Sequence, residues 1–220
     1  TLMAQGSIAK TEPGKGKFTK VQFTSDHGRI EDVLGLFTSE RAPMSGAIVF
    51  HATTELPPGD QPFLRKVQLQ GSFDIAQGTF SNNKTQHGVD ELSAGARGQN
   101  KDDPADVLSG LKGQVKLVEG LAHFSELSFS IPGAHADMQG TYGLDEPHRV
   151  NLHGQMRVET RISKTTSGVK SFFLKVIDPI FKKKKKGEVV PVHILGTYEK
   201  PDFGLDLGNK QDEQNAKTKK

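Results

Sequence analysis

The strongest constraint on the fold is a repeated alternation of apolar and polar residues, interrupted at short intervals by glycine or proline. Successive side chains of a β-strand point to opposite faces of the sheet, so this alternation predicts strands with one apolar and one wet face. Connections as short as Glu119–Gly120, Pro132–Gly133 and Asp145–Pro147 predict hairpins between neighbouring strands. The sequence therefore predicts a mainly β protein built as an antiparallel meander.

Two segments have helical spacing instead. Apolar residues recur on one helical face within Arg29–Phe37 and again within Val169–Phe181. The polar segment Lys84–Asp106 is expected to be mainly loop, and the tail Asn209–Lys220 to be disordered. Strands are expected over Leu2–Lys10, Phe18–Thr24, Gly46–Thr54, Leu64–Phe80, Gln114–Val118, Ala122–Phe124, Glu126–Ile131, Ala134–Gly140, Arg149–Val158, Val189–Tyr198 and Phe203–Leu207.

One five-residue pattern recurs, with glycine in the middle and apolar residues at both ends. It occurs as Leu69–Phe73, Leu152–Met156 and, nearly, Met138–Tyr142, and Ile194–Tyr198 repeats it with an apolar second residue. The simplest explanation is that glycine within a strand permits a bulge or a sharp curl. Repeated curling bends a meander into a trough. The expected fold is an elongated, curved antiparallel β-sheet groove with short flanking amphipathic helices.

The alternation also assigns a set of apolar residues to the inner face of this groove. Hydrophobic residues make up only 34% of the 220-residue chain, which favours an open groove over a single deep core. Phe brings apolar area without a hydrogen-bonding group, and its excess over Tyr and Trp suits a lining. We predict an inner face that consists of Phe73, Ile75, Val115, Leu117, Phe124, Leu127, Phe129, Ile131, Met138, Leu152, Met156, Val192 and Ile194.

No catalytic, metal-binding or cofactor motif accompanies the pattern. Cysteine is absent, no two of the eight His have the spacing of a helical zinc site, and no nucleophile elbow or phosphate-binding glycine motif occurs. The formal charge of +3 gives no general support for nucleic-acid binding. We therefore expect a protein that is not an enzyme, carries no cofactor or metal and does not bind nucleic acid.

Five consecutive lysines follow the second helical pattern. Such a run is often no more than a solvated segment. Apolar residues next to clustered lysines are also the means by which peripheral segments bind anionic lipid. The sequence therefore predicts a membrane-surface or groove-closing element that consists of Phe172, Phe173, Val176, Ile177, Ile180, Lys182, Lys183, Lys184, Lys185 and Lys186.

Three blocks, Gly71–Phe80, Leu111–Ala134 and Val190–Leu205, carry a family resemblance. The last is the most specific, because a strand with Gly196-Thr197 is followed by Pro201-x-Phe203. Together they resemble the C-terminal region of bacterial AsmA-like proteins over roughly residues 67–207. The resemblance implies an elongated repeating β-groove, an inner-membrane anchor at the N-terminus, a body in the periplasm and a role in outer-membrane lipid homeostasis.

On this resemblance, we expect the chain to be the distal piece of a longer protein whose membrane anchor lies in a missing N-terminal part. Residues 1–66 would be N-terminal strands with a short helix, 67–208 the AsmA-like β-groove and 209–220 a disordered tail. The implied function is to bind or conduct phospholipid between the inner and outer membranes. The implied partners are phospholipid acyl chains, an anionic membrane surface and an outer-membrane or envelope protein. The alternative is a scaffold or chaperone-like module that assists outer-membrane protein assembly.

Overall fold

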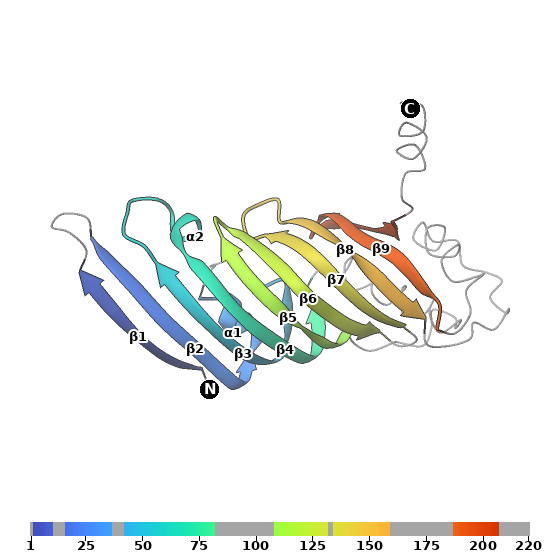
Figure 1. Ribbon diagram of the computed structural model, residues 1–220, viewed down its shortest axis with the longest axis horizontal. Helices are drawn as coiled ribbons and strands as arrows, with labels where there is room; N and C mark the ends of the chain where they lie inside the picture. Colours follow the sequence, from blue (N-terminus) through green and yellow to red (C-terminus); the bar gives the residue numbers. More distant parts are fainter. Residues whose placement is uncertain are drawn as a thin grey trace, which may run out of the picture.

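One antiparallel sheet forms nearly all of the described chain (Figure 1). The computed structural model describes residues 2–10, 16–36, 42–81, 108–131, 134–158 and 187–206. Ten strands pair in the order in which they occur along the chain, so the predicted meander is confirmed. The strands are β1 (Met3–Lys10), β2 (Lys17–Arg29), β3 (Met44–Leu56), β4 (Gln68–Phe80), β5 (Leu108–Val118), β6 (Leu121–Ile131), β7 (Ala134–Gly143), β8 (Arg149–Val158), β9 (Val189–Thr197) and β10 (Lys200–Leu205).

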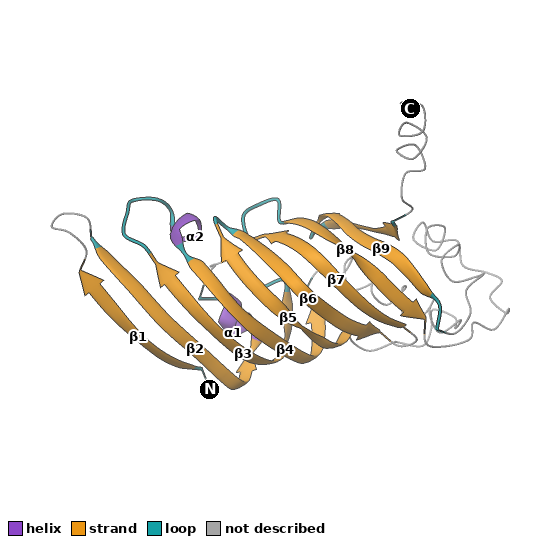
Figure 2. Cartoon of the chain, in the orientation of Figure 1, coloured by secondary structure: helices purple, strands orange, loops and turns teal. Residues whose placement is uncertain are grey.

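The sheet is open and curled, as expected from the sequence. Figure 2 shows the strands side by side along the long axis of the molecule, with each strand bent across that axis. Side chains alternate between the two faces. On β3, for example, Ile48, Phe50 and Ala52 are buried, whereas Val49 and His51 between them are exposed. The concave face is therefore apolar and the convex face polar.

Glycines of the recurring pattern lie on the concave face, where the bend brings neighbouring strands close together. Gly140 pairs with Phe124 on one side and Leu152 on the other, and both of these face inward. A Cβ atom at Gly140 would lie 2.0 Å from the Asn151 carbonyl oxygen, and one at Gly154 would lie 2.1 Å from that of Asp137. Since no side chain fits at either position, these glycines are required by the curl itself.

One long rim of the sheet contains the turn between β5 and β6 and the turn between β7 and β8. The first of these turns, Glu119–Gly120, has two positive φ angles that suit a two-residue hairpin. Arg65 ties two turns of this rim together: its guanidinium donates to the Glu119 carbonyl oxygen at 3.0 Å and lies 2.6 Å from the Asp145 carboxylate. Glu119 and Asp145 lie in turns that are separated by strands β6 and β7. Because Arg65 contacts both turns, it holds them close together and so supports the curvature of the sheet.

Two short helices interrupt the strands, and three sequence predictions need correction. The helix expected over Arg29–Phe37 is only the single turn α1 (Ile30–Leu34) among the described residues. The strand expected from Leu64 begins at Gln68, because α2 (Phe63–Lys66) forms a helical turn after Pro62. The two strands expected on either side of Ser125 form the single strand β6, with a bulge at Ser125–Glu126.

The remaining predictions on organisation concern the ends and the division of the chain. The helix expected over Val169–Phe181, the loop Lys84–Asp106 and the tail Asn209–Lys220 lie outside the described residues. The expected boundary after residue 66 falls between α2 and β4, and β3 and β4 on either side of it pair in the same sheet. Within the described ranges, no helix has the length and hydropathy needed to cross a bilayer.

We predict that Gly140→Ala destabilises the sheet by at least about 2 kcal/mol, because a side chain at φ +144° is strained and clashes with the neighbouring backbone. Chemical denaturation would measure the loss. The matched control is Gly35→Ala at the end of α1, where φ is −60° and the nearest neighbouring atom would lie 3.4 Å from the added Cβ. Equal stabilities of the two variants would contradict this explanation of the curl.

Candidate functional site

The concave face of the sheet forms an apolar trough, lined by the inner side chains of β3 to β10 and by α1. The cavity volume is about 310 Å³, and the open space between the walls, which continues into solvent, is about 1890 Å³. Polar side chains in the wall are few, and Tyr142 and Tyr198 contribute hydroxyl groups. The wall therefore offers contact area to an apolar occupant but few groups that could orient a polar one.

All thirteen residues predicted for the inner face lie in the wall of this trough. They lie on β4 (Phe73, Ile75), β5 (Val115, Leu117), β6 (Phe124, Leu127, Phe129, Ile131), β7 (Met138), β8 (Leu152, Met156) and β9 (Val192, Ile194). The structure thus brings the whole set together on one concave surface.

The lining residues divide into a deep part and a half-buried part. Ile75, Leu127 and Met156 are among those that are buried, with exposed fractions of 1%, 5% and 4%. Five others, Phe73, Val115, Phe124, Leu152 and Ile194, are only partly buried. Solvent therefore reaches part of the apolar lining.

Four of the half-buried residues form a continuous line along the trough. Val115 pairs with Phe124, Phe124 with Gly140, Gly140 with Leu152, and Leu152 with Ile194. We call Val115, Phe124, Leu152 and Ile194 the half-buried stripe. It crosses from β5 to β9, four strand spacings of about 4.8 Å, and so extends over roughly 19 Å. Phe73 packs edge-on against Phe124, with ring centroids 6.0 Å apart.

Sequence reasoning missed part of the wall. Ile48 and Phe50 on β3 alternate as clearly as the residues that were assigned, but they lie before the region of family resemblance. Phe203 on β10 and Leu111 on β5 were also missed. The α1 residues Ile30, Val33 and Leu34 were recognised as a helical face, but nothing in their spacing indicates that this face lies in the trough.

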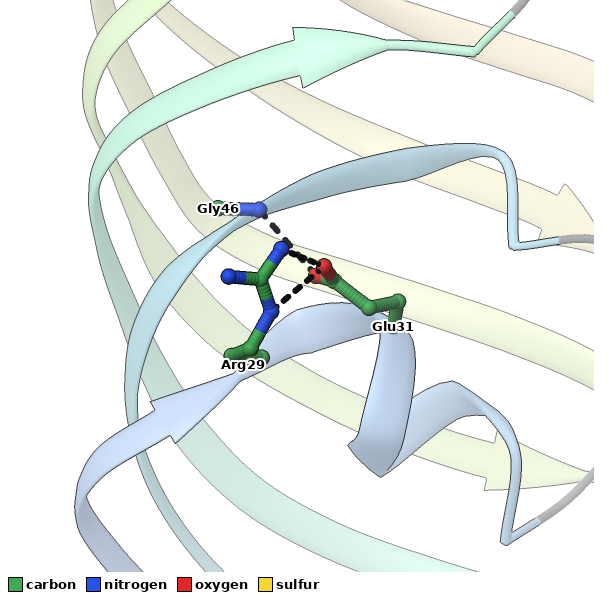
Figure 3. Close-up of polar contacts among 3 residues, drawn as sticks. All are labelled: Arg29, Glu31 and Gly46. Atoms are coloured by element: carbon green, nitrogen blue, oxygen red, sulfur yellow. Dashed lines mark hydrogen bonds and ion pairs between the residues drawn. The ribbon is translucent and has the colours of Figure 1, made fainter.

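Helix α1 is held in place by its own acidic residue (Figure 3). The Glu31 carboxylate accepts hydrogen bonds from Arg29 Nε at 2.7 Å, from Arg29 Nη2, and from the Gly46 backbone N–H at 3.2 Å. Burial by itself would raise the pKa of Glu31, but the hydrogen bonds from its own backbone N–H, Arg29 and Gly46 lower that pKa below its ordinary value. The contacts link the end of β2 to the start of β3 and direct Ile30 and Val33 into the trough.

The chain that leads into β3 reaches across the trough. The Pro43 carbonyl oxygen accepts a hydrogen bond from the Ser81 backbone N–H at 2.9 Å, at the end of β4. The same oxygen accepts one from the Tyr198 hydroxyl, in the turn between β9 and β10. Ser81 and Tyr198 follow the ends of strands on opposite rims, so Pro43 connects the two rims over the apolar lining.

Two polar clusters lie on the convex face. Ser130 Oγ lies 2.9 Å from His135 Nδ1, and His135 Nε2 lies 3.4 Å from Asp137 Oδ1. These are the residue types of a hydrolytic triad, but a triad uses a buried carboxylate to orient the imidazole. The Asp137 side chain is 73% exposed. The cluster is therefore a group of polar contacts at the surface of the sheet.

The second cluster joins β8, β9 and the end of β10. His153 Nδ1 lies 2.6 Å from Asp206 Oδ2, and His193 Nδ1 lies 3.7 Å from Asp206 Oδ1. The hydrogen bond from His153 lowers the pKa of Asp206, and burial opposes this only in part. The cluster fastens the last strand to its neighbours. In the part of the chain that the structure describes, no three His, Asp or Glu side chains are arranged to hold a metal ion.

The predicted membrane-surface residues, Phe172 to Lys186, lie outside the described residues. The trough is therefore the candidate site that the structure describes. Comparison of the chain with protein-family models, curated proteins and solved structures finds no match.

We predict that Glu31→Gln destabilises the protein by about 1 kcal/mol at neutral pH, because the variant loses the charged acceptor for Arg29 and Gly46. The folded-state pKa of Glu31 is lowered, so its contribution is present above its ordinary pKa of 4.5 and is lost as the pH falls through the lowered value. Denaturation curves of wild type and variant should therefore converge in acid.

The matched control for this prediction is Asp32→Asn, which removes an exposed acidic residue from the same helical turn. Its effect should stay within a few tenths of a kcal/mol. A pH-independent difference between wild type and Glu31→Gln would contradict the assigned role of the carboxylate.

Proposed function

We propose that this chain holds the acyl chains of phospholipids in its apolar trough, and that it does so as the periplasmic groove module of an AsmA-like envelope protein. The half-buried stripe carries this proposal. A row of apolar side chains that runs along the trough and contacts solvent is unfavourable by about 25 cal/mol for each Å² left in water. A hydrocarbon occupant that lies along the stripe would remove this cost.

The direction of the stripe suits an acyl chain better than a compact ligand. The stripe runs perpendicular to the strands, so an occupant along it contacts one strand after another. Because the wall has few polar groups, little fixes an acyl chain at one position along the trough. Such a wall supports movement of a lipid along the groove, as conduction between the inner and outer membranes would require. No chemical reaction is part of this proposal.

Two further elements of the proposal come from the sequence. The resemblance to AsmA-like proteins supports a periplasmic location, with an inner-membrane anchor in another part of the full-length protein. The apolar helical face and lysines of Val169–Lys186 support docking on an anionic membrane surface, where the trough could receive or deliver lipid. A scaffold that assists outer-membrane protein assembly remains the alternative, and lipid binding distinguishes the two.

Native mass spectrometry of the gently purified chain should reveal bound phospholipid. We predict that Leu152→Asp, which places a charge in the middle of the half-buried stripe, weakens binding of a phospholipid with a fluorescent acyl chain at least about tenfold. The control, Gln155→Asp on the convex face of the same strand, should bind as wild type. Circular dichroism would verify that both variants fold. Absence of lipid from the purified protein, together with equal probe binding by both variants, would favour the scaffold alternative.

For the lysine run, we predict that replacing Lys182 to Lys186 with Gln strongly reduces binding to vesicles that contain anionic phospholipid. Each lysine near a charged surface contributes on the order of 1 kcal/mol, and salt weakens that attraction. Cosedimentation with anionic and with neutral vesicles would measure the effect. Binding that survives the replacement but is lost in Phe173→Asp would show instead that the segment acts as a hydrophobic plug.

A further inference from the structure

A single carbonyl oxygen links two parts of the sheet that are far apart in strand order. Pro43 precedes β3 and continues its pairing with β4, because the Ser81 backbone N–H donates to the Pro43 carbonyl oxygen at 2.9 Å. The same oxygen accepts a hydrogen bond from the Tyr198 hydroxyl, in the turn between β9 and β10. Strands β4 and β9 are five strand spacings of about 4.8 Å apart, so in a flat sheet they would be separated by about 24 Å. The contact therefore exists only in the curled sheet.

Both partners of this contact lie in the wall of the apolar trough. Met44, next to Pro43, is buried in the same wall, with an exposed fraction of 8%. The Tyr198 backbone N–H donates to the His148 carbonyl oxygen at 2.9 Å, which anchors Tyr198 to the turn between β7 and β8. The Tyr198 side chain therefore extends from an anchored turn on one rim to the strand end on the other.

The contact can break without leaving a buried polar group unpaired. A carbonyl oxygen has two lone pairs, so Pro43 keeps its hydrogen bond from Ser81 when the Tyr198 hydroxyl moves away. Pro43 and Tyr198 are both half-buried, and water can replace either partner. A neutral hydrogen bond that exchanges with water shifts an equilibrium by only roughly two- to tenfold. Such a contact holds two parts of the sheet together and still opens readily.

We propose that the hydrogen bond between Tyr198 and Pro43 is a clasp that closes the curled sheet, and that its release lets acyl chains enter and leave the trough. The first part rests on the geometry of the sheet. The second part rests on the proposed function, because it makes the clasp the control of entry to a lipid trough. The clasp can close again over a bound chain, so it changes the rates of entry and exit by the same factor and leaves the affinity nearly unchanged.

Opening of the clasp can be measured without lipid, because the chain contains no cysteine that would react in the background. Met44→Cys places a thiol in the buried wall beside Pro43. Iodoacetamide should modify this thiol roughly two- to tenfold faster when Tyr198→Phe, which keeps the ring and removes the hydroxyl, is also present. The control thiol is Val49→Cys, on the exposed convex face of the same strand, and its rate should not change.

The effect on lipid is measured separately, by stopped-flow mixing with a phospholipid that carries a fluorescent acyl chain. Tyr198→Phe should raise the association and dissociation rate constants by the same factor, roughly two- to tenfold, with little change in the dissociation constant. Tyr142→Phe, which removes a hydroxyl elsewhere in the same wall, should leave both the thiol labelling and the two rate constants unchanged.

The two measurements separate the parts of the proposal. Equal labelling of Met44→Cys with and without Tyr198→Phe would overturn the clasp. Faster labelling together with unchanged probe kinetics would overturn its role in lipid entry. A wild-type chain that binds no probe would contradict the proposed function and the control of lipid entry, whereas the labelling result would still decide whether the clasp opens the sheet. Circular dichroism would verify that each variant folds.

Discussion

The structure depends on one constraint: an apolar sheet face with no second layer of sheet or long helix in the described chain to cover it. A flat sheet of this kind would leave its whole apolar face in water, which is unfavourable. Curling reduces the exposed area, because it turns the lining residues of different strands toward one another. Concave-face glycines make the curl possible, since Gly140 and Gly154 stand where any side chain would collide with a neighbouring carbonyl group. The curl covers the deep residues and leaves the half-buried stripe in contact with solvent.

Short elements at the rims complete this arrangement. Helix α1 is too short to form a layer, yet Ile30 and Val33 bury themselves at one end of the wall because Glu31 fixes the turn against Arg29 and Gly46. Pro43, which follows α1 in sequence, links Ser81 and Tyr198 across the trough. In a two-layered protein a second sheet would cover the apolar face. Here Ile30, Val33 and the contact between Pro43 and Tyr198 cover part of it. This leaves the trough partly open.

The sequence predicted the sheet well because its information is local. Alternation with period two sets the inward face of each strand, and short turns set the antiparallel order, so all thirteen predicted lining residues lie in the trough. The errors occur where tertiary contacts decide. Ser125 and Glu126 interrupt the alternation of apolar and polar residues, so the sequence predicts a break between two strands. In the structure these two residues form a bulge within the single strand β6. The contact between Pro43 and Tyr198 joins residues 155 positions apart, and no periodic signal reports it.

The two ends of the described sheet differ in how deeply their residues are buried. At β10, Phe203 is buried in the trough, and the His153–Asp206 contact fastens the chain just beyond the strand. All eight residues of β1 are exposed, although Ala4 and Ile8 lie on the face that continues the apolar lining. The trough is therefore formed between β3 and β10, because the curl there turns the apolar side chains of different strands toward one another.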